Sequence, residues 1–347
     1  MSYKKSALMI VAICLALVSA GCAKKNENVE VGMKSIASLD YQTALSYFGA
    51  AQKAGENERL IQRGMGIAYM GLTDYDQAAA CFENALKGSD GIPQPIDYDL
   101  NYYLASAYTK SGRLKEAERT YDAILSMKPQ ETDALFLRGN VRLGIGKGED
   151  AKSDFDQVAS MEPQNYDRLI QIFEVMNFYG RKEDGQAYLK AALERNDSKM
   201  SAYDRGRMHY YLEEYQQAYI ALEEARSSGG AEAYLYLGRA YEATGDYNYA
   251  ANVYSAYLAK DTSNAEIYNQ LGVCEMAKGE YEKALTAFQA GMKAPNNMIQ
   301  QTLAFNEIVA YEHLGEFQQA TVLMQTYLNN YPDDEKAQRE FQFLSTR

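Results

Sequence analysis

The chain has 347 residues, of which 47% are apolar and 24% are charged, so it holds enough apolar material for a folded interior and is not expected to be disordered. Its formal charge of -12 argues against binding to nucleic-acid backbones or anionic headgroups, because these surfaces repel an acidic protein. Six prolines and no tryptophan, set against thirty tyrosines, favour helices whose interiors combine small and aromatic side chains. We therefore expect an all-α protein that does not bind nucleic acid.

The first 21 residues are typical of an export signal. Lys4 and Lys5 provide a charged start, and a mainly apolar stretch follows from Ala7 to Gly21. This stretch is shorter than the ~20 apolar residues that a helix needs to cross about 30 Å of hydrocarbon, which argues against a permanent membrane span. We assign residues 1–21 to a signal peptide. An uncleaved signal anchor and ordinary secretion are the alternatives.

The apolar stretch ends in the sequence LVSAGC at residues 17–22, which resembles the lipobox of bacterial lipoproteins. The resemblance implies that Cys22 is acylated and becomes the new N-terminus. Acyl chains contribute about 0.8 kcal/mol per buried CH₂, so they hold a protein at a membrane without a spanning helix. Residues 22–28 would then form a short lipidated tether. The implied location is the extracytoplasmic side of a cell membrane or an outer membrane, and the tether sequence is compatible with either.

A helical pattern repeats along the body with a period of about 34 residues, which is typical of stacked helical hairpins. In the second helix of each unit, a small residue is followed one turn later by a large apolar residue. These small residues are Ala44, Ala78, Ala117, Ala151, Gly185, Ala218, Ala250, Ala284 and Ala320. Twelve residues earlier, the first helix of most units carries another small residue. We expect small and large side chains to interlock where the two helices cross.

A glycine separates the two helices in most units, and we expect it to adopt the left-handed conformation that ends the first helix. These glycines are Gly112, Gly146, Gly180, Gly245, Gly279 and Gly315. With the recurrent small residue, tyrosine, alanine and aromatic residue, the pattern resembles the tetratricopeptide repeat family over about residues 25 to 332, most clearly at residues 231–261. The resemblance implies a right-handed α-solenoid, or superhelix, of about nine helical hairpins.

The repeats divide the chain into segments. Repeats 1 and 2 cover residues 29–90, and repeats 3 to 9 cover residues 98–332. The surplus residues 91–97 between them form a loop, which we identify as a candidate hinge or boundary. Repeat 5 departs most from the pattern, because Phe173 occupies a position that is small in most other repeats. Residues 333–347 are expected to form a helix that caps the last repeat, since an open solenoid needs a polar outer end.

The sequence shows no residues arranged for catalysis, for a metal or for a cofactor. Its two histidines, His209 and His313, lie in different repeats, and Cys81 and Cys274 are too far apart along the stack for a disulfide. The glycine-rich run Gly144–Gly148 lacks the spacing of a phosphate-binding loop, and the motifs of serine hydrolases and zinc proteases are absent. We therefore predict a binding protein without a metal or cofactor, and not an enzyme.

The family resemblance implies a concave groove that is lined by fixed positions of the first helices and accepts an extended peptide or a partner helix. The residues at these positions include Tyr102, Ser106, Phe136, Asn140, Glu174, Asn177, Tyr203, Arg207, Tyr210, Arg239, Glu242 and Asn269. Tyrosine and arginine are common in interface hot spots. We expect an aromatic and cationic patch, able to bind an acidic or C-terminal segment, that comprises Tyr203, Arg207, Tyr210 and Arg239. The alternative is that these side chains pair with neighbouring glutamates on a solvated wall.

Taken together, the sequence predicts a lipid-anchored interaction scaffold or adaptor of the bacterial cell envelope that recruits a protein partner. A second candidate is an envelope module that binds a small molecule or glycan, and a third is a hydrolase that acts through paired carboxylates. The three candidates predict different measurements. The adaptor loses its partner when the groove is mutated, the small-molecule module is stabilised by its ligand, and the hydrolase shows turnover.

Overall fold

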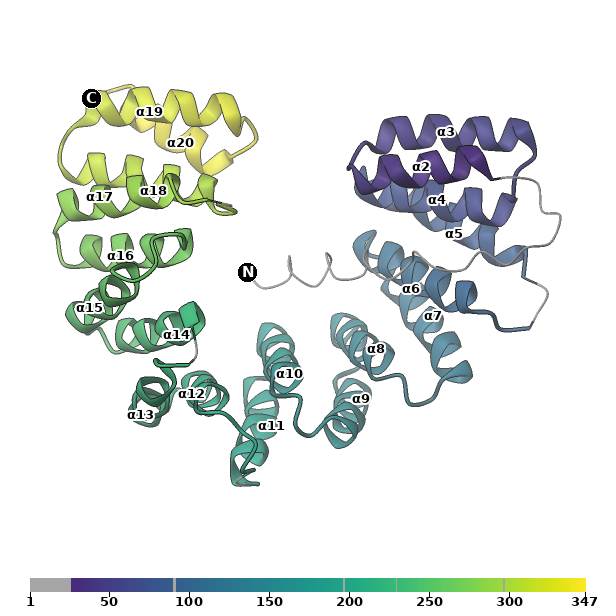
Figure 1. Cartoon of the computed structure of the whole chain (residues 1–347), viewed down its shortest axis with the longest axis horizontal. Helices are drawn as coiled ribbons and strands as arrows, with labels where there is room; N and C mark the ends of the chain where they lie inside the picture. The colour runs from purple at the N-terminus through teal and green to yellow at the C-terminus, as the bar shows by residue number, and fades with distance from the viewer. Residues whose placement is uncertain (1–25, 90–91, 196, 229, 296) are drawn as a thin grey trace. The chain divides into compact units, whose positions relative to one another are not determined.

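The structure is a computed structural model that describes residues 26–89, 92–195, 197–228, 230–295 and 297–347. These residues form 19 α-helices and no β-strand, which confirms the predicted all-α fold (Figure 1). The predicted signal peptide, Cys22 and the first part of the tether lie outside the described residues. Among the residues that are described, no helix is both long and apolar enough to cross a lipid bilayer.

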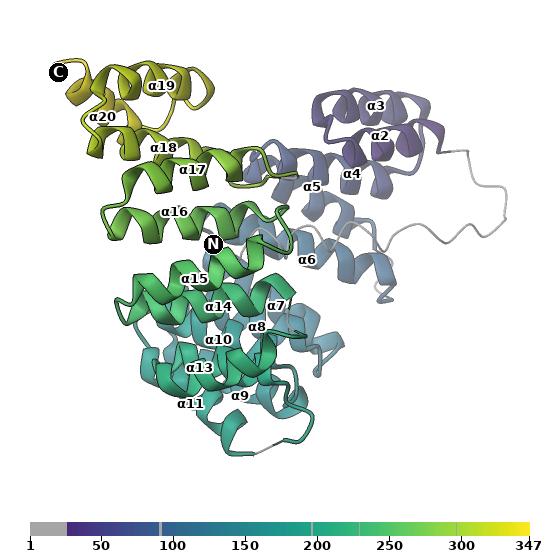
Figure 2. The same cartoon turned by 60° about the vertical axis from the view of Figure 1, so that its left-hand side comes forward.

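The helices belong to two compact units, of which the first ends at Lys182 and the second comprises Glu183–Arg347. The first unit contains α2 (Glu27–Ala37), α3 (Tyr41–Ala54), α4 (Glu58–Gly71), α5 (Tyr75–Lys87), α6 (Pro95–Lys110), α7 (Leu114–Met127), α8 (Thr132–Gly144), α9 (Gly148–Met161) and α10 (Tyr166–Phe178). The second contains α11 (Lys182–Glu194), α12 (Ala202–Tyr211), α13 (Tyr215–Ala225), α14 (Gly230–Ala243), α15 (Tyr247–Leu258), α16 (Ala265–Ala277), α17 (Tyr281–Met292), α18 (Gln300–His313), α19 (Phe317–Asn330) and α20 (Glu335–Leu344). In this second unit, each helix from α12 to α19 packs on the next one along the chain, and Figure 2 shows the run from α16 to α20.

The loop predicted at residues 91–97 is shorter in the structure, because α6 begins at Pro95. Proline suits the first turn of a helix, where its missing N–H would have no partner within the helix. The helices on either side of the loop pack directly, and Phe82 of α5 stacks on Tyr103 of α6 with ring centroids 5.3 Å apart. The two compact units divide between α10 and α11, the two helices of repeat 5.

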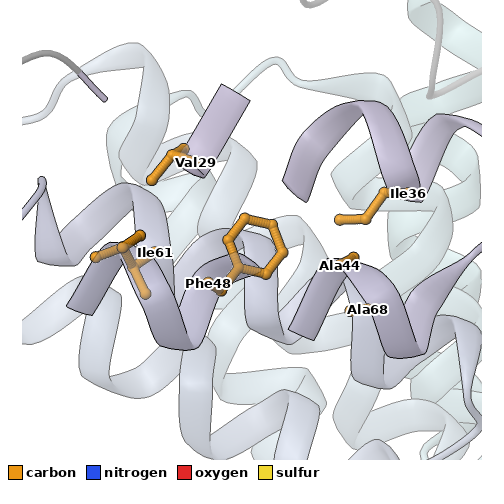
Figure 3. Packing of buried hydrophobic residues seen from close by; sticks show 7 residues of the cluster. Val29, Ile36, Ala44, Phe48, Ile61 and Ala68 are labelled. Atoms are coloured by element: carbon orange, nitrogen blue, oxygen red, sulfur yellow. The ribbon is translucent and has the colours of Figure 1, made fainter. Parts of the chain in front are cut away.

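The hairpins are held together by a small residue of the first helix that faces a large residue of the second. A Cβ atom added to Gly32 would lie 2.7 Å from Cε1 of Phe48, and one added to Gly272 would lie 2.3 Å from Cε1 of Phe288. Real side chains do not approach so closely, so glycine lets each ring pack against the helix backbone. This confirms the predicted interlocking at these hairpins. Figure 3 shows the first core, in which the ring of Phe48 lies among Val29, Ile36, Ala44, Ile61 and Ala68.

The turn inside each hairpin contains one residue with a left-handed backbone. All six predicted turn glycines adopt this conformation, with φ between 76° and 80°. In the turns of repeats 1, 2 and 6, the same position holds Leu39, Thr73 and Glu213, with φ of 61°, 62° and 63°. The left-handed region costs a residue with a Cβ atom about 1–2 kcal/mol, and it is least suited to a β-branched residue such as Thr73.

Replacing Thr73 by glycine is therefore expected to raise the free energy of unfolding of the first unit by about 0.5–1 kcal/mol. The gain is smaller than the full strain, because glycine also gives the unfolded chain more freedom. Urea denaturation followed by circular dichroism measures the change. The control is Thr43→Gly in the first turn of α3, which should lose a few tenths of a kcal/mol because glycine is a poor helix former. A Thr73→Gly variant that is no more stable than wild type would contradict the argument.

The predicted capping helix is present as α20. It buries Ala337 and Leu344 in a core shared with α18 and α19. Its start is fixed by Asp334, whose carboxylate accepts hydrogen bonds from the backbone N–H of Ala337 at 3.0 Å and from the hydroxyl of Tyr327 at 2.7 Å. The side chain of Asp334 therefore joins α20 to α19, and the last repeat is covered as an open stack requires.

The attachment of α20 is expected to depend on pH through Glu312 of α18. Burial, together with the charge and hydrogen bond of Glu340 on α20, raises the pKa of Glu312 to about 7 from an ordinary value of 4.5. Between pH 4.5 and about pH 7, Glu312 is therefore mostly protonated when α20 is attached and mostly ionised when α20 is detached. Attachment is strongest below pH 4.5 and weakens as the pH rises through about 7. Hydrogen exchange of the α20 amides at about pH 5 and pH 8, corrected for intrinsic rates, measures this. Glu312→Gln should remove most of the difference, whereas Glu316→Gln should not.

Candidate functional site

The predicted groove residues all lie on first helices of hairpins, but they are divided between the two compact units. Those in the first unit are Tyr102, Ser106, Phe136, Asn140, Glu174 and Asn177. Those in the second unit are Tyr203, Arg207, Tyr210, Arg239, Glu242 and Asn269. Each set is therefore considered as a surface of its own unit.

In the first unit, the predicted aromatic residues are mostly used for packing. Phe136 is 9% exposed, and its ring lies 5.8 Å from that of Phe155 and is covered by the guanidinium of Arg168 at 4.6 Å. Tyr102 packs edge-on against Tyr121 at 6.5 Å, and burial raises the pKa of its hydroxyl. Phe136 and Tyr102 thus offer little aromatic surface to a partner.

In the second unit, α12 and α14 bring the four residues of the predicted patch together around a fifth, Tyr236. The ring of Tyr236 lies edge-to-face with the rings of Tyr203 and Tyr210, at centroid distances of 6.0 Å and 5.6 Å. The guanidinium of Arg239 lies 5.8 Å from the centre of the Tyr236 ring, and that of Arg207 lies 4.4 Å from the centre of the Tyr203 ring. We call these five residues the tyrosine–arginine patch.

Both cations of the patch are paired with carboxylates of the same unit. Arg207 lies 2.5 Å from Asp204 one turn earlier on α12, and Arg239 lies 2.5 Å from Glu266 on α16. The side chain of Arg207 is only 10% exposed, whereas that of Arg239 is 30% exposed. The alternative of pairing with a neighbouring glutamate is therefore observed for Arg239, whereas Arg207 pairs with an aspartate. The patch is mainly aromatic, and Arg239 is its more accessible cation.

Tyr236, which the structure places at the centre of the patch, is not among the groove residues predicted from the sequence. The groove positions taken from the family do not include it. Its spacing was nevertheless informative, because Tyr236 precedes Arg239 by three residues and so shares a face of α14 with it. Its hydroxyl also lies 3.0 Å from that of Tyr211. The signal in the sequence is therefore a tyrosine one helical turn from a predicted arginine.

Glu242 and Asn269, the remaining predicted residues of the second unit, join neighbouring helices. Glu242 of α14 accepts a hydrogen bond from the hydroxyl of Tyr254 at 2.5 Å and another from Gln270 of α16 at 3.3 Å. Asn269 is 8% exposed, and its side-chain oxygen accepts a hydrogen bond from Asn306 of α18 at 2.8 Å. The bonds from Gln270 and Asn306 run between successive first helices, whereas that from Tyr254 lies within one hairpin, and both residues help to hold the face on which the patch lies.

The histidines and cysteines of the described residues are engaged in packing or pairing within the fold. His209 lies 2.7 Å from Glu214, and the ring of His313 stacks on that of Tyr281 at 4.9 Å. Cys81 and Cys274 are buried, unpaired thiols. Within the described ranges, no group of three or more histidine, cysteine, aspartate or glutamate side chains is arranged to hold a metal ion.

Comparison with known proteins identifies the repeat. The family model of the tetratricopeptide repeat matches residues 63–132, 203–265 and 235–297. A comparison with curated protein sequences gives no match. Among solved structures, the chain is similar to a tetratricopeptide repeat protein from Parabacteroides merdae, with 16% identity and a TM-score of 0.48 over 82% of this chain and 97% of that one.

Two further solved structures are similar at comparable levels. Yeast Tom70 shares 13% identity at a TM-score of 0.49, over 92% of this chain and 88% of that one. YrrB, described as a tetratricopeptide repeat protein with an unusual peptide-binding site, shares 18% identity at a TM-score of 0.40, over 56% of this chain and 92% of that one. The matched repeats fall in both compact units, where the structure shows interlocked helical hairpins. The matched residues show that the chain contains tetratricopeptide repeats, and proteins built from these repeats typically act as scaffolds for protein–protein interactions.

Proposed function

We propose that this protein is a lipid-anchored adaptor on the extracytoplasmic side of a bacterial envelope membrane, and that it holds a protein partner on the first-helix face of its second unit. The observation that carries the proposal is the tyrosine–arginine patch on α12 and α14. Tyrosine and arginine supply much of the binding energy at protein interfaces. Here the rings already contact one another edge-to-face, so less side-chain freedom is lost when a partner binds.

The chemistry of the partner is suggested by Arg239 and the rings beside it. A guanidinium has five N–H donors, and one nitrogen of Arg239 donates to Glu266 at 2.5 Å. A carboxylate of the partner could use other donors of the same group, while Tyr210 and Tyr236 provide apolar surface next to it. We therefore expect a segment that carries an acidic side chain or a C-terminal carboxylate beside an apolar residue. This agrees with the partner class that the sequence predicts.

The experiment is chemical cross-linking of the tagged protein in native membranes, followed by identification of what it captures. The test variant combines Arg239→Gln with Tyr210→Leu, which removes an accessible cation and one ring of the patch. Arg207 is left unchanged, because its side chain is 10% exposed and paired with Asp204. The matched control is Lys283→Gln, which removes a cation from α17, a second helix of a hairpin. Circular dichroism confirms that both variants keep their helices.

A partner captured by wild type and by Lys283→Gln, but not by the double variant, would support both the adaptor and its face. A partner captured by all three would support an adaptor but reject the patch as its binding surface. If wild type captures no partner, the adaptor function is contradicted. Ligand screening would then test the small-molecule or glycan alternative.

The lipid anchor rests on the sequence at residues 17–22 and has its own test. Cys22→Ser is expected to abolish incorporation of a labelled fatty acid and to release the protein from the membrane fraction. A variant that stays in the membrane would favour an uncleaved signal anchor. Wild-type protein that incorporates no label would contradict lipidation directly.

A further inference from the structure

Cations of this chain repeatedly lie over an aromatic ring while pairing with a carboxylate. For example, Arg113 lies 4.4 Å from the centre of the Tyr108 ring and 3.4 Å from Glu116. Other cations in this arrangement are Lys128, Arg168, Arg207, Arg226 and Arg239. The attraction between a cation and a ring face adds to that between the cation and the carboxylate. In this chain, a ring beside a carboxylate is thus a recurrent cation site.

The second unit contains a stack of three tyrosine rings that ends in an exposed ring. Tyr219 and Tyr241 have ring centroids 4.3 Å apart and planes inclined by 11°, and Tyr241 and Tyr249 are 5.4 Å apart and inclined by 20°. A hydrogen bond of 2.7 Å between the hydroxyls of Tyr219 and Thr244 fixes the inner end. Tyr249 is 60% exposed. Since one face of its ring covers Tyr241, the opposite face is open to solvent.

Two carboxylates accompany this stack. Burial and the charges of Glu223 and Asp246 raise the pKa of the Tyr241 hydroxyl, the middle ring of the stack. Asp246 also accepts a hydrogen bond from the backbone N–H of Tyr249 at 3.4 Å, so its carboxylate lies beside the backbone of the residue that carries the outermost ring. The tyrosine stack therefore has carboxylates next to it, as do the rings at the recurrent cation sites.

Of the two carboxylates, Glu223 is already paired with a cation of the chain, whereas none of the ion pairs among the described residues includes Asp246. Arg226 pairs with Glu223 at 2.7 Å, but its guanidinium lies over Tyr234, 5.2 Å from the ring centre. Within the described residues, none of the cations that lie over aromatic rings covers a ring of the stack. The Tyr249 ring and Asp246 thus provide the ring and the negative charge of the recurrent arrangement without the cation.

We propose that Tyr249, with Asp246 and Glu223, is a docking site for an arginine or lysine side chain of a protein partner. A guanidinium would extend the stack by one layer and donate hydrogen bonds to the carboxylates. An apolar occupant would remove water from these carboxylates without replacing its hydrogen bonds, and an anion would be repelled by them. The site differs from the tyrosine–arginine patch, which is suited to an acidic segment, and the two proposals do not depend on each other.

The probe is the peptide acetyl-Gly-Arg-Gly-Arg-Gly-amide, compared with the same peptide carrying citrulline in place of arginine. Citrulline retains the planar shape but has no charge. Binding is measured by isothermal titration calorimetry on the full-length chain in a non-ionic detergent, and spectra of ¹³C-labelled tyrosine identify the ring that is contacted. The arginine peptide is expected to bind and to shift the Tyr249 resonance. The citrulline peptide should bind at least about two- to fivefold more weakly, as expected for one exposed contact between a cation and a ring.

Three variants and a control separate the contributions to peptide binding of the Tyr249 ring, of the Asp246 charge and of the general attraction to an acidic protein. Tyr249→Leu should weaken binding about two- to fivefold, whereas Tyr249→Phe, which keeps the ring face, should not. Asp246→Asn should weaken binding similarly while preserving the fold, because asparagine caps a helix as well as aspartate does. The control is Glu280→Gln, which removes one negative charge at the corresponding turn before α17 and should leave binding unchanged.

Several results would overturn the proposal. Equal binding of the two peptides would show that the charge is not recognised. Equal losses in Asp246→Asn and Glu280→Gln would show only general attraction to an acidic protein. Binding of maltotriose that Tyr249→Leu abolishes and Asp246→Asn leaves intact would assign the stack to a sugar. Self-association lost in Tyr249→Leu would assign it to a second copy of the chain instead of a separate partner.

Discussion

Replacing Asp154 by alanine is expected to destabilise the first unit by about 3 kcal/mol, the lower end of the range for breaking a buried ion pair. The side chain of Asp154 on α9 is 1% exposed. Its carboxylate accepts hydrogen bonds from Arg138 at 2.6 Å and 3.0 Å and from Arg142 at 2.8 Å. The variant would leave both guanidinium groups without their most deeply buried partner. The loss stays at the lower end because Asp122 and Glu118 still pair with them.

Urea denaturation measures this loss, and hydrogen exchange should locate it in α8 and α9. The control is Asp156→Ala, the same substitution two residues later on the same helix. Asp156 is 52% exposed and pairs with Lys152 one turn earlier at 2.9 Å. An exposed pair of this kind contributes about 0.5 kcal/mol or less, so the control should remain close to wild type. Similar losses in the two variants would show that burial does not decide the effect.

The repeated hairpins could be predicted from the sequence because their determinants are local. Gly272 and Phe288 are related by a fixed spacing within one hairpin, and Gly279 ends the first helix of that hairpin with a left-handed backbone. The ion-pair network around Asp154 could not be predicted in the same way, because its members lie on α7, α8 and α9. Helical spacing indicates which residues share a face, but it does not identify which charged residue is covered by the neighbouring hairpin. The same limit explains why the division within repeat 5 was not predicted.

Those parts of the candidate site that depend only on which residues share a face of one helix could be predicted from the sequence. Tyr203 and Arg207 came together because they lie one turn apart on one helix, next to the equivalent helix that carries Arg239. The pairing of Arg239 with Glu266 joins two repeats and depends on the rotation between them. Phe136 occupies an equivalent groove position, yet its ring packs inward because Phe155 faces it. Position in the repeat therefore predicts a face, whereas the neighbouring side chains decide which residues remain accessible.

The second large effect is expected for Gly272→Ala. The added Cβ would lie 2.3 Å from Cε1 and 2.6 Å from Cδ1 of Phe288, which is 1% exposed and has no room to move away. Overpacking of a core costs about 1–3 kcal/mol, and the better helix propensity of alanine returns up to about 1 kcal/mol. We therefore expect a net loss of about 1–2 kcal/mol in the free energy of unfolding of the second unit. The control is Gly49→Ala, where no atom lies within 4 Å of the new Cβ and a gain of about 0.5–1 kcal/mol is expected.

A double-mutant cycle with Phe288→Leu separates packing from helix propensity. Phe288→Leu alone leaves a partial cavity and destabilises the unit, but it also makes room for the Cβ at position 272. The double variant should therefore be more stable than the sum of the single losses predicts, by about 1 kcal/mol. The chain itself varies each of the two positions separately, since Gly206 faces Leu222 in repeat 6 and Ala105 replaces glycine in repeat 3. If the two losses in the free energy of unfolding were strictly additive, the ring at position 288 would not be the reason for the small residue at position 272. Another interaction would then have to explain why the repeat keeps a small residue there.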